Sequence, residues 1–322
     1  MKHLSHLLQQ LFSARLNLLL IAISTLAVSN TAMAQLKPKA TNHKKIVFAL
    51  NAYSFNDLLM AKSPRDQQPL YSLANLLDWC SVQNINAVDI TGYYFPGYPD
   101  VPSDEYIGKI KSKAKQLGIA ISGTGIRNNF ASPDPAVRAA DVELAKKWIV
   151  VASKLGAPVL RVFAGEIPKG YENKWDEVAG WMIECYKECA EYAKQYGVMV
   201  GIQNHGDMLK TADECIKVLK AVNSNQIGLI VDTGNFNTED PYADIEALVP
   251  FAVNWQVKES PFGIGNPIPT DYVRLMKIIK KGGYRGYVPV ETIFVRGNAY
   301  DPFALVPGMM EELKAADKAS GK

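Results

Sequence analysis

The sequence predicts a single (β/α)8 barrel, in which eight parallel strands alternate with helices. From residue 46 onward, a short β-rich run, a turn and a longer amphipathic stretch recur, and eight such units follow one another. Alternating strands and helices favour a parallel sheet, and eight successive units favour a closed barrel over an open, doubly wound sheet. The expected strands are residues 46–52, 87–91, 120–126, 158–165, 198–205, 227–234, 252–259 and 286–292.

The segments between these strands have the end signals of helices. Thr211 suits an N-cap, and Asp134 and Asp240 each fit an N-cap followed by proline at the first helical position. Gly156 follows a helical stretch and suits a C-cap. The expected helices include residues 70–82, 103–118, 134–156, 175–196 and 211–222.

The N-terminus has the layout of a secretory signal peptide. Lys2 and Arg15 are basic, residues 16–28 form an apolar run, and Ala32-Met33-Ala34 is a small-x-small cleavage site. The run is too short for a comfortable membrane span, although an uncleaved anchor helix is the alternative. We therefore expect residues 1–34 to be removed and the protein to be exported, to the periplasm, without stable membrane insertion.

The remaining chain is expected to consist of a short lead-in and one domain. Residues 35–45 are polar and predict a flexible lead-in, and residues 46–320 predict one catalytic barrel domain. Removing the leader's two basic residues leaves 33 basic and 32 acidic residues, a net charge of +1. Nucleic-acid partners need a concentrated basic face, so this balance argues against them. The oligomeric state stays open.

The cysteines are sparse for an exported protein. Four cysteines without a C-x-x-C spacing indicate neither a zinc site nor a disulfide scaffold. We expect buried free thiols, with one disulfide as the alternative, at Cys80, Cys185, Cys189 and Cys215.

Polar residues gather where the expected strands end, which is the functional face of such barrels. Placing so many polar groups on one buried rim is costly unless they are paired or bind a ligand. Asp232 and Glu291 are the strongest pair, because each ends an apolar run and the two could face one divalent ion. The alternative is a bond from these carboxylates to Lys258 or Arg161.

At these residues the chain resembles the xylose-isomerase-like TIM barrels of the sugar phosphate isomerase/epimerase superfamily, over most of the mature chain. The family has Glu-Asn-His at strand five, Asp-x-x-His or Asp-x-x-Asn at strand six, His-x-Lys-Asp at strand seven and a Glu at strand eight. The corresponding residues here are Gln203-Asn204-His205, Asp232-Thr233-Gly234-Asn235, Gln256-Val257-Lys258-Glu259 and Glu291.

The resemblance implies a divalent metal ion held by Asp232, Glu291, Gln203 and Gln256. Two of these four positions are glutamine where the family has Glu and His, which implies a weaker site for a hard ion such as Mn²⁺ or Mg²⁺. His205 joins this shell or binds substrate. A barrel that has lost its metal is the alternative.

The resemblance also implies acid/base chemistry, for which Glu291, His205 and Lys258 are the candidates, since a carboxamide moves no proton at neutral pH. An ion pair to Asp232 or Asp89 is the other interpretation of Lys258. Aromatic residues such as Tyr93 could provide a stacking surface for a sugar. The expected substrate-binding residues are Asn51, Tyr53, Asp89, Arg161, Asn204, Asn235 and Trp255.

These features predict metal-assisted enolisation of a non-phosphorylated sugar or keto-sugar, with isomerase/epimerase activity as the first hypothesis. A lyase that cleaves 3-keto-glycosides by β-elimination is the second, because the family's symmetric acid/base pair is broken here. A non-catalytic sugar-binding barrel is the third.

Overall fold

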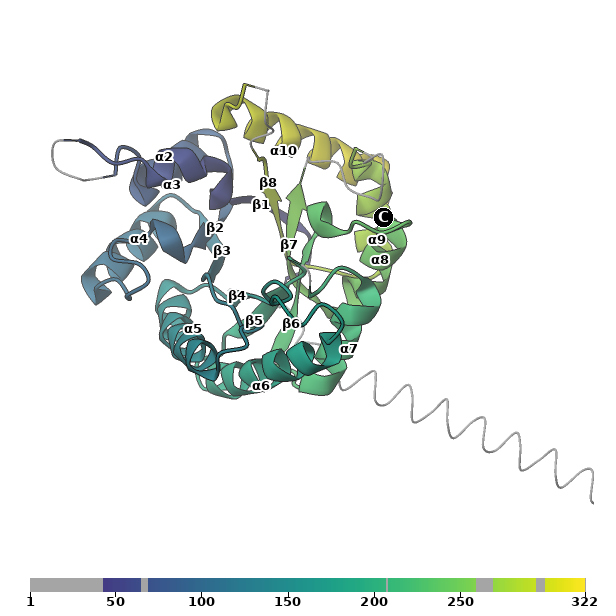
Figure 1. The fold of residues 1–322 in the computed structure, drawn as a ribbon. Helices are drawn as coiled ribbons and strands as arrows, with labels where there is room; N and C mark the ends of the chain where they lie inside the picture. Colours follow the sequence, from purple (N-terminus) through teal and green to yellow (C-terminus); the bar gives the residue numbers. More distant parts are fainter. Residues whose placement is uncertain (1–42, 65–68, 207, 259–268, 294–298, 322) are drawn as a thin grey trace, which may run out of the picture. The chain divides into compact units, whose positions relative to one another are not determined.

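The computed structural model describes residues 43–64, 69–206, 208–258, 269–293 and 299–321. Its eight strands form a closed parallel barrel in chain order, with β8 paired to β1 (Figure 1). The predicted (β/α)8 fold is therefore confirmed, and each strand lies within a few residues of its predicted bounds. The strands are β1 (Val47–Asn51), β2 (Ala87–Thr91), β3 (Ala120–Gly125), β4 (Val159–Phe163), β5 (Met199–Gln203), β6 (Ile227–Asp232), β7 (Ala252–Lys258) and β8 (Tyr287–Glu291).

Helices form a ring outside the strands (Figure 1). The predicted caps are confirmed: Asp134 and Asp240 cap helices that begin with proline, and Thr211 forms a capping box with Glu214. The helices are α2 (Asn56–Met60), α3 (Leu73–Val82), α4 (Asp104–Gln116), α5 (Pro135–Leu155), α6 (Trp175–Lys194), α7 (Ala212–Val222), α8 (Pro241–Leu248), α9 (Tyr272–Lys281) and α10 (Pro302–Ala319). Of these, α2, α8, α9 and α10 were not delimited from the sequence.

Two N-terminal predictions fall outside the described residues: the signal peptide 1–34, and the lead-in up to residue 42. Within the described ranges, no helix is both long and apolar enough to cross a membrane. All four cysteines are buried free thiols, as expected.

The barrel interior changes from apolar to polar along the strands. Val159, Met199 and Ile230 belong to a buried apolar cluster, and Gly201 lies between them, because a Cβ on it would come within 2.8 Å of Val159 and Ile230. Two residues further along, the same faces of β4, β5 and β6 present polar side chains (Arg161, Gln203 and Asp232). The apolar layer thus forms the floor beneath the polar residues.

We expect Gly201→Ala to destabilise the fold by about 1–3 kcal/mol, because the added methyl overpacks this layer. Gly180→Ala is the matched control: Gly180 lies in α6 with open space around its Cβ position, and alanine is the better helix former by roughly 0.5–1 kcal/mol. Urea denaturation measures both changes. Equal stability of Gly201→Ala and the wild type would contradict this packing.

Candidate active site at the carboxyl ends of the strands

A cavity of about 700 Å³ opens at the carboxyl ends of the strands. Of the thirteen residues predicted for the site, eight line it: Asn51, Tyr53, Arg161, Gln203, His205, Gln256, Lys258 and Glu291. The structure therefore brings together residues from β1, β4, β5, β7 and β8, as expected for a barrel of this kind.

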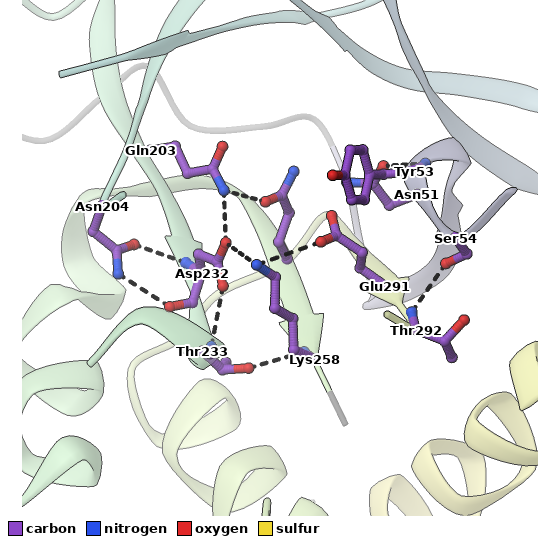
Figure 2. A network of polar contacts seen from close by, with 12 residues as sticks. Asn51, Tyr53, Ser54, Gln203, Asn204, Asp232, Thr233, Lys258, Glu291 and Thr292 are labelled. Carbon is purple, nitrogen blue, oxygen red and sulfur yellow. Dashed lines mark hydrogen bonds and ion pairs between the residues drawn. The ribbon is translucent and has the colours of Figure 1, made fainter. Parts of the chain in front are cut away.

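The ammonium of Lys258 lies between the two predicted acidic residues (Figure 2). Its Nζ is 3.0 Å from Oδ2 of Asp232 and 3.4 Å from Oε1 of Glu291. All three residues are at most 9% exposed. The ion-pair alternative for Lys258 is thus confirmed for Asp232, and it extends to Glu291.

These charges determine the protonation of the site. Burial alone would lower the pKa of Lys258, but Asp232 and Glu291 raise it above its ordinary value, so the ammonium keeps its proton. Burial raises the pKa of Glu291, and Lys258 opposes this rise while the charge of Asp232 adds to it. Glu291 is therefore a carboxyl group whose proton affinity is higher than usual.

The two glutamines complete the network around Asp232. Nε2 of Gln203 donates to Oδ2 of Asp232 at 2.6 Å and also to Oε1 of Gln256. The amide nitrogen of Gln203 therefore faces Asp232. The Oε1 of Gln203 is buried and has no hydrogen-bond partner among the described residues. Oδ1 of Asp232 accepts from the backbone N–H of Gly234 at 3.0 Å.

Backbone contacts fix the ends of the three central strands. Oδ1 of Asn204 accepts from the N–H of Asp232 at 2.8 Å, and its Nδ2 donates to the carbonyl of the same residue at 3.0 Å. Thr233 accepts from the backbone N–H of Lys258 at 3.0 Å. These contacts hold β5, β6 and β7 in register where the polar side chains emerge.

Arg161 is held on the other side of the cavity. Its Nη2 donates to the hydroxyl of Tyr93 at 2.5 Å, and its guanidinium lies 4.0 Å from the centre of the Phe163 ring. Gly125 on the neighbouring strand leaves room for it, since a Cβ there would come within 2.6 Å of Nε. Tyr93 is the predicted aromatic residue that reaches the cavity.

His205 lies exposed at the mouth, just past the end of β5, with its ring 4.9 Å from that of Phe163. Desolvation lowers the pKa of the imidazole; Asp232 opposes this, and Lys258 and Arg161 add to it. The neutral form of His205 is therefore favoured at neutral pH, and this form can both donate and accept a proton.

Five predicted residues do not line the cavity: Asp232, Asp89, Asn204, Asn235 and Trp255. Asp232 contacts two residues that line the cavity, Lys258 and Gln203. The side chain of Asn204 is hydrogen-bonded to the backbone of Asp232. Trp255 is fully buried with its ring 5.8 Å from Tyr284, because it alternates with the inward-facing Gln256. Asn235 follows β6 in a short 3-10 turn. The structure therefore places Asn204, Asn235 and Trp255 outside the cavity lining, and their role as substrate-binding residues stays a prediction.

Asp89 is buried in the barrel interior, where its Oδ2 accepts from Asn254 at 3.0 Å. Gly123 opposite leaves room for this carboxyl group. Burial raises the pKa of Asp89 to about 6, with Arg161 and Asn254 opposing the rise and Glu291 adding to it. The structure places Asp89 below the cavity lining, bonded to Asn254, and its role in substrate binding stays a prediction.

The structure adds cavity residues that the sequence analysis did not select. Arg127 lies at the rim with its guanidinium 4.5 Å from the centre of the Tyr93 ring. Asn128 clamps the backbone of Phe163 with two hydrogen bonds of 2.8 Å. The signal in the sequence was the polar run that follows β3. The added lining residues include Arg127, Asn128, Asn129, Glu166, Thr292 and Tyr300.

Comparison with known proteins agrees with this architecture. Residues 78–314 match the family model described as xylose isomerase-like TIM barrel. The chain belongs to this family. An L-ribulose-5-phosphate 3-epimerase of Escherichia coli is 22% identical over 264 residues, which cover 75% of this chain and 92% of that protein. An uncharacterized protein of Methanocaldococcus jannaschii is 24% identical over 184 residues, 52% of this chain; the match spans only 62% of that protein's length.

Solved structures share the same barrel. A D-psicose 3-epimerase from Clostridium cellulolyticum has a TM-score of 0.63 at 19% identity, covering 85% of this chain and 98% of its own. A 3-keto-D-glucoside 4-epimerase from Escherichia coli has a TM-score of 0.64 at 11% identity, with coverage of 84% and 100%. The IOLI protein, solved with a zinc atom, has a TM-score of 0.65 at 14% identity, with coverage of 85% and 97%. At these identities the likeness shows the fold alone.

The arrangement of the predicted metal ligands does not fit a divalent ion. A protonated lysine lies where the ion would bridge Asp232 and Glu291, and Gln203 turns a nitrogen, not an oxygen, toward Asp232. In the part of the chain that the structure describes, no group of three or more His, Cys, Asp or Glu side chains gathers as a metal site. The four residues predicted to hold a metal instead form a network around an ammonium.

We expect Lys258→Met to bind Mn²⁺ at least tenfold more tightly than the wild type in isothermal titration calorimetry. The change keeps most of the side-chain volume, removes the positive charge and leaves two carboxylates facing one another. Lys217→Met, at an exposed lysine of α7, is the control. Circular dichroism verifies folding. Tight Mn²⁺ binding by the wild type, unchanged in Lys258→Met, would contradict the arrangement.

A second prediction concerns pH. Because the folded-state pKa of Asp89 is about 6 and an unfolded aspartate titrates near pH ~4, the folded protein takes up an extra proton between these values. The stability of the wild type relative to Asp89→Asn should therefore fall by about 2–3 kcal/mol as the pH rises from 4 to 7. Urea unfolding at several pH values measures this difference. A constant difference would contradict the raised pKa.

Proposed function

We propose that this protein enolises a non-phosphorylated sugar or keto-sugar, as an epimerase or isomerase whose fixed cation is the ammonium of Lys258. The proposal retains the predicted chemistry, proton removal next to a carbonyl, and replaces the predicted metal ion with a residue of the chain. In this reaction Glu291 is the base, Lys258 donates a hydrogen bond to the carbonyl oxygen, and His205 is a second acid/base group.

One observation supports this proposal above the others. An ammonium has three N–H donors, and two of those on Lys258 are directed at Asp232 and Glu291. The described residues offer this ammonium no third partner, so one N–H remains for a ligand in a cavity that Lys258 and Glu291 both line. A buried donor beside a base is the arrangement that stabilises a developing enolate.

The reaction can be written with the residues of the chain. Glu291 takes the proton from the carbon beside the carbonyl, the C–H electron pair forms the carbon–carbon double bond, and the carbonyl oxygen becomes an enolate that Lys258 holds. Delivery of a proton from a second donor to the other face of the same carbon gives the epimer. Return of the proton from Glu291 to the former carbonyl carbon gives an isomer, provided that the hydroxyl on the neighbouring carbon becomes the new carbonyl and its proton passes to the former carbonyl oxygen. His205 follows the end of β5, whereas Glu291 ends β8, and His205 is our candidate donor of the proton that forms the epimer.

Two features favour a non-phosphorylated keto-sugar over a sugar phosphate. The leader-like N-terminus is the reason that we place the enzyme outside the cytoplasm, where phosphorylated sugars are scarce. One structural neighbour is an epimerase of a 3-keto-D-glucoside, which makes keto-glycosides a natural part of a substrate panel. On such a substrate, loss of a β-oxygen from the same enolate would give the lyase outcome.

The test is solvent exchange in D₂O after treatment with EDTA, using D-fructose, D-psicose, D-tagatose and a 3-keto-glucoside. Proton NMR follows loss of the signal beside the carbonyl. We expect exchange to persist in EDTA, to fall at least a thousandfold in Glu291→Gln, and to rise with pH as Glu291 loses its proton. Because the pKa of Glu291 is raised, this rise lies above the usual carboxyl range.

Glu184→Gln, an exposed glutamate of α6 paired with Lys187, is the matched control and should exchange normally. In His205→Gln we expect exchange to persist while epimer formation falls. Release of the aglycone would assign the lyase outcome instead. Absence of exchange across the panel, together with tight binding of the same sugars, would favour the non-catalytic sugar-binding barrel.

A further inference from the structure

We infer that Arg161, with Arg127 at the rim, forms a subsite for a carboxylate of the substrate, so that the sugar processed here is a sugar acid. This inference names part of the substrate of the proposed reaction and therefore rests on that proposal. Arg161 carries a buried charge that has no part in the reaction proposed above.

Arg161 is a charged side chain that has no ion partner within the described part of the chain. It is only 4% exposed, yet among the described residues no carboxylate oxygen lies within 4.0 Å of its guanidinium. Its Nη1 is buried and makes no hydrogen bond to these residues. Asp89 and Glu291 act on it only through longer-range electrostatics. Such an arrangement is costly unless a ligand completes it.

The guanidinium is also held in a fixed position. Tyr93 accepts from Nη2, Phe163 lies against the guanidinium, and Gly125 leaves the space that Nε occupies. Arg161 lines the cavity, so the unpaired Nη1 with its two N–H groups remains as the part of the side chain available to a ligand. Holding an arginine in this way lowers the entropic cost of binding a planar anion.

Among the described residues, the positively charged side chains that line the cavity lie at two places. At the ends of β7 and β8, Lys258 is shared between two carboxylates. At the ends of β3 and β4, Arg127 and Arg161 both lie near Tyr93. A substrate whose carbonyl reaches Lys258 and whose carboxylate reaches Arg161 would span the cavity. Such a substrate would be oriented by its charge.

The experiment measures equilibrium binding by calorimetry with three probes: D-glucuronate, D-glucose and D-glucose 6-phosphate. We expect the wild type to bind glucuronate at least tenfold more tightly than glucose. Arg161→Met should remove this preference, and Arg127→Gln should reduce it in part. Arg274→Gln is the matched control, because this arginine also lies over an aromatic ring, Tyr242, but outside the cavity, and should keep the preference.

Gly125→Ala provides a second test should Arg161→Met fail to fold, since the added Cβ displaces the guanidinium without removing it. Equal binding of glucuronate and glucose by the wild type would overturn the inference. Tighter binding of glucose 6-phosphate than of glucuronate would overturn it in favour of phosphate. The readout needs no turnover, so a wild type that shows solvent exchange but no preference for glucuronate contradicts this inference alone. A wild type that shows the preference but no exchange contradicts only the proposed reaction.

Discussion

Two buried carboxylates near one another need a cation between them, and this requirement shapes the mouth of the barrel. Asp232 and Glu291 end two strands at positions from which water is largely excluded, where the charge of Asp232 raises the pKa of Glu291 and two uncompensated like charges would destabilise the fold. The chain supplies the cation itself, from Lys258 on the strand between them. Because the ammonium is covalently attached, its position and charge are fixed by folding.

The neighbouring residues are consistent with this cation. A carboxylate or imidazole at position 203 or 256 would change the charge around Asp232, whereas a carboxamide adds a donor and an acceptor without net charge. The amide nitrogen of Gln203 donates to both Asp232 and the amide oxygen of Gln256. One solved neighbour, the IOLI protein, holds a zinc atom, whereas in this chain the cation between the two carboxylates is the ammonium of Lys258.

Much of this site could be predicted from two features of the sequence: the apolar runs that mark the strands, and the polar residues at the ends of those runs. The apolar runs located the strands, and Asp232 and Glu291 were selected because each ends such a run, whereas Lys258 was selected as a polar residue at a strand end and from the family motif. The alternation of strand residues could also have placed Trp255 and Asn204 away from the cavity, since they lie between inward-facing neighbours. The direction of the Gln203 amide and the bridging position of Lys258 depend on contacts between β5, β6, β7 and β8, so sequence spacing alone leaves them open. Arg127 was missed because it lies in a loop without periodicity.

The most direct test of this account is anomalous diffraction at the manganese edge from crystals grown with millimolar Mn²⁺. We predict no anomalous peak between Asp232 and Glu291, and continuous density for Lys258 ending between the two carboxylates. A manganese peak bonded to both carboxylates, with the lysine side chain turned away, would contradict it.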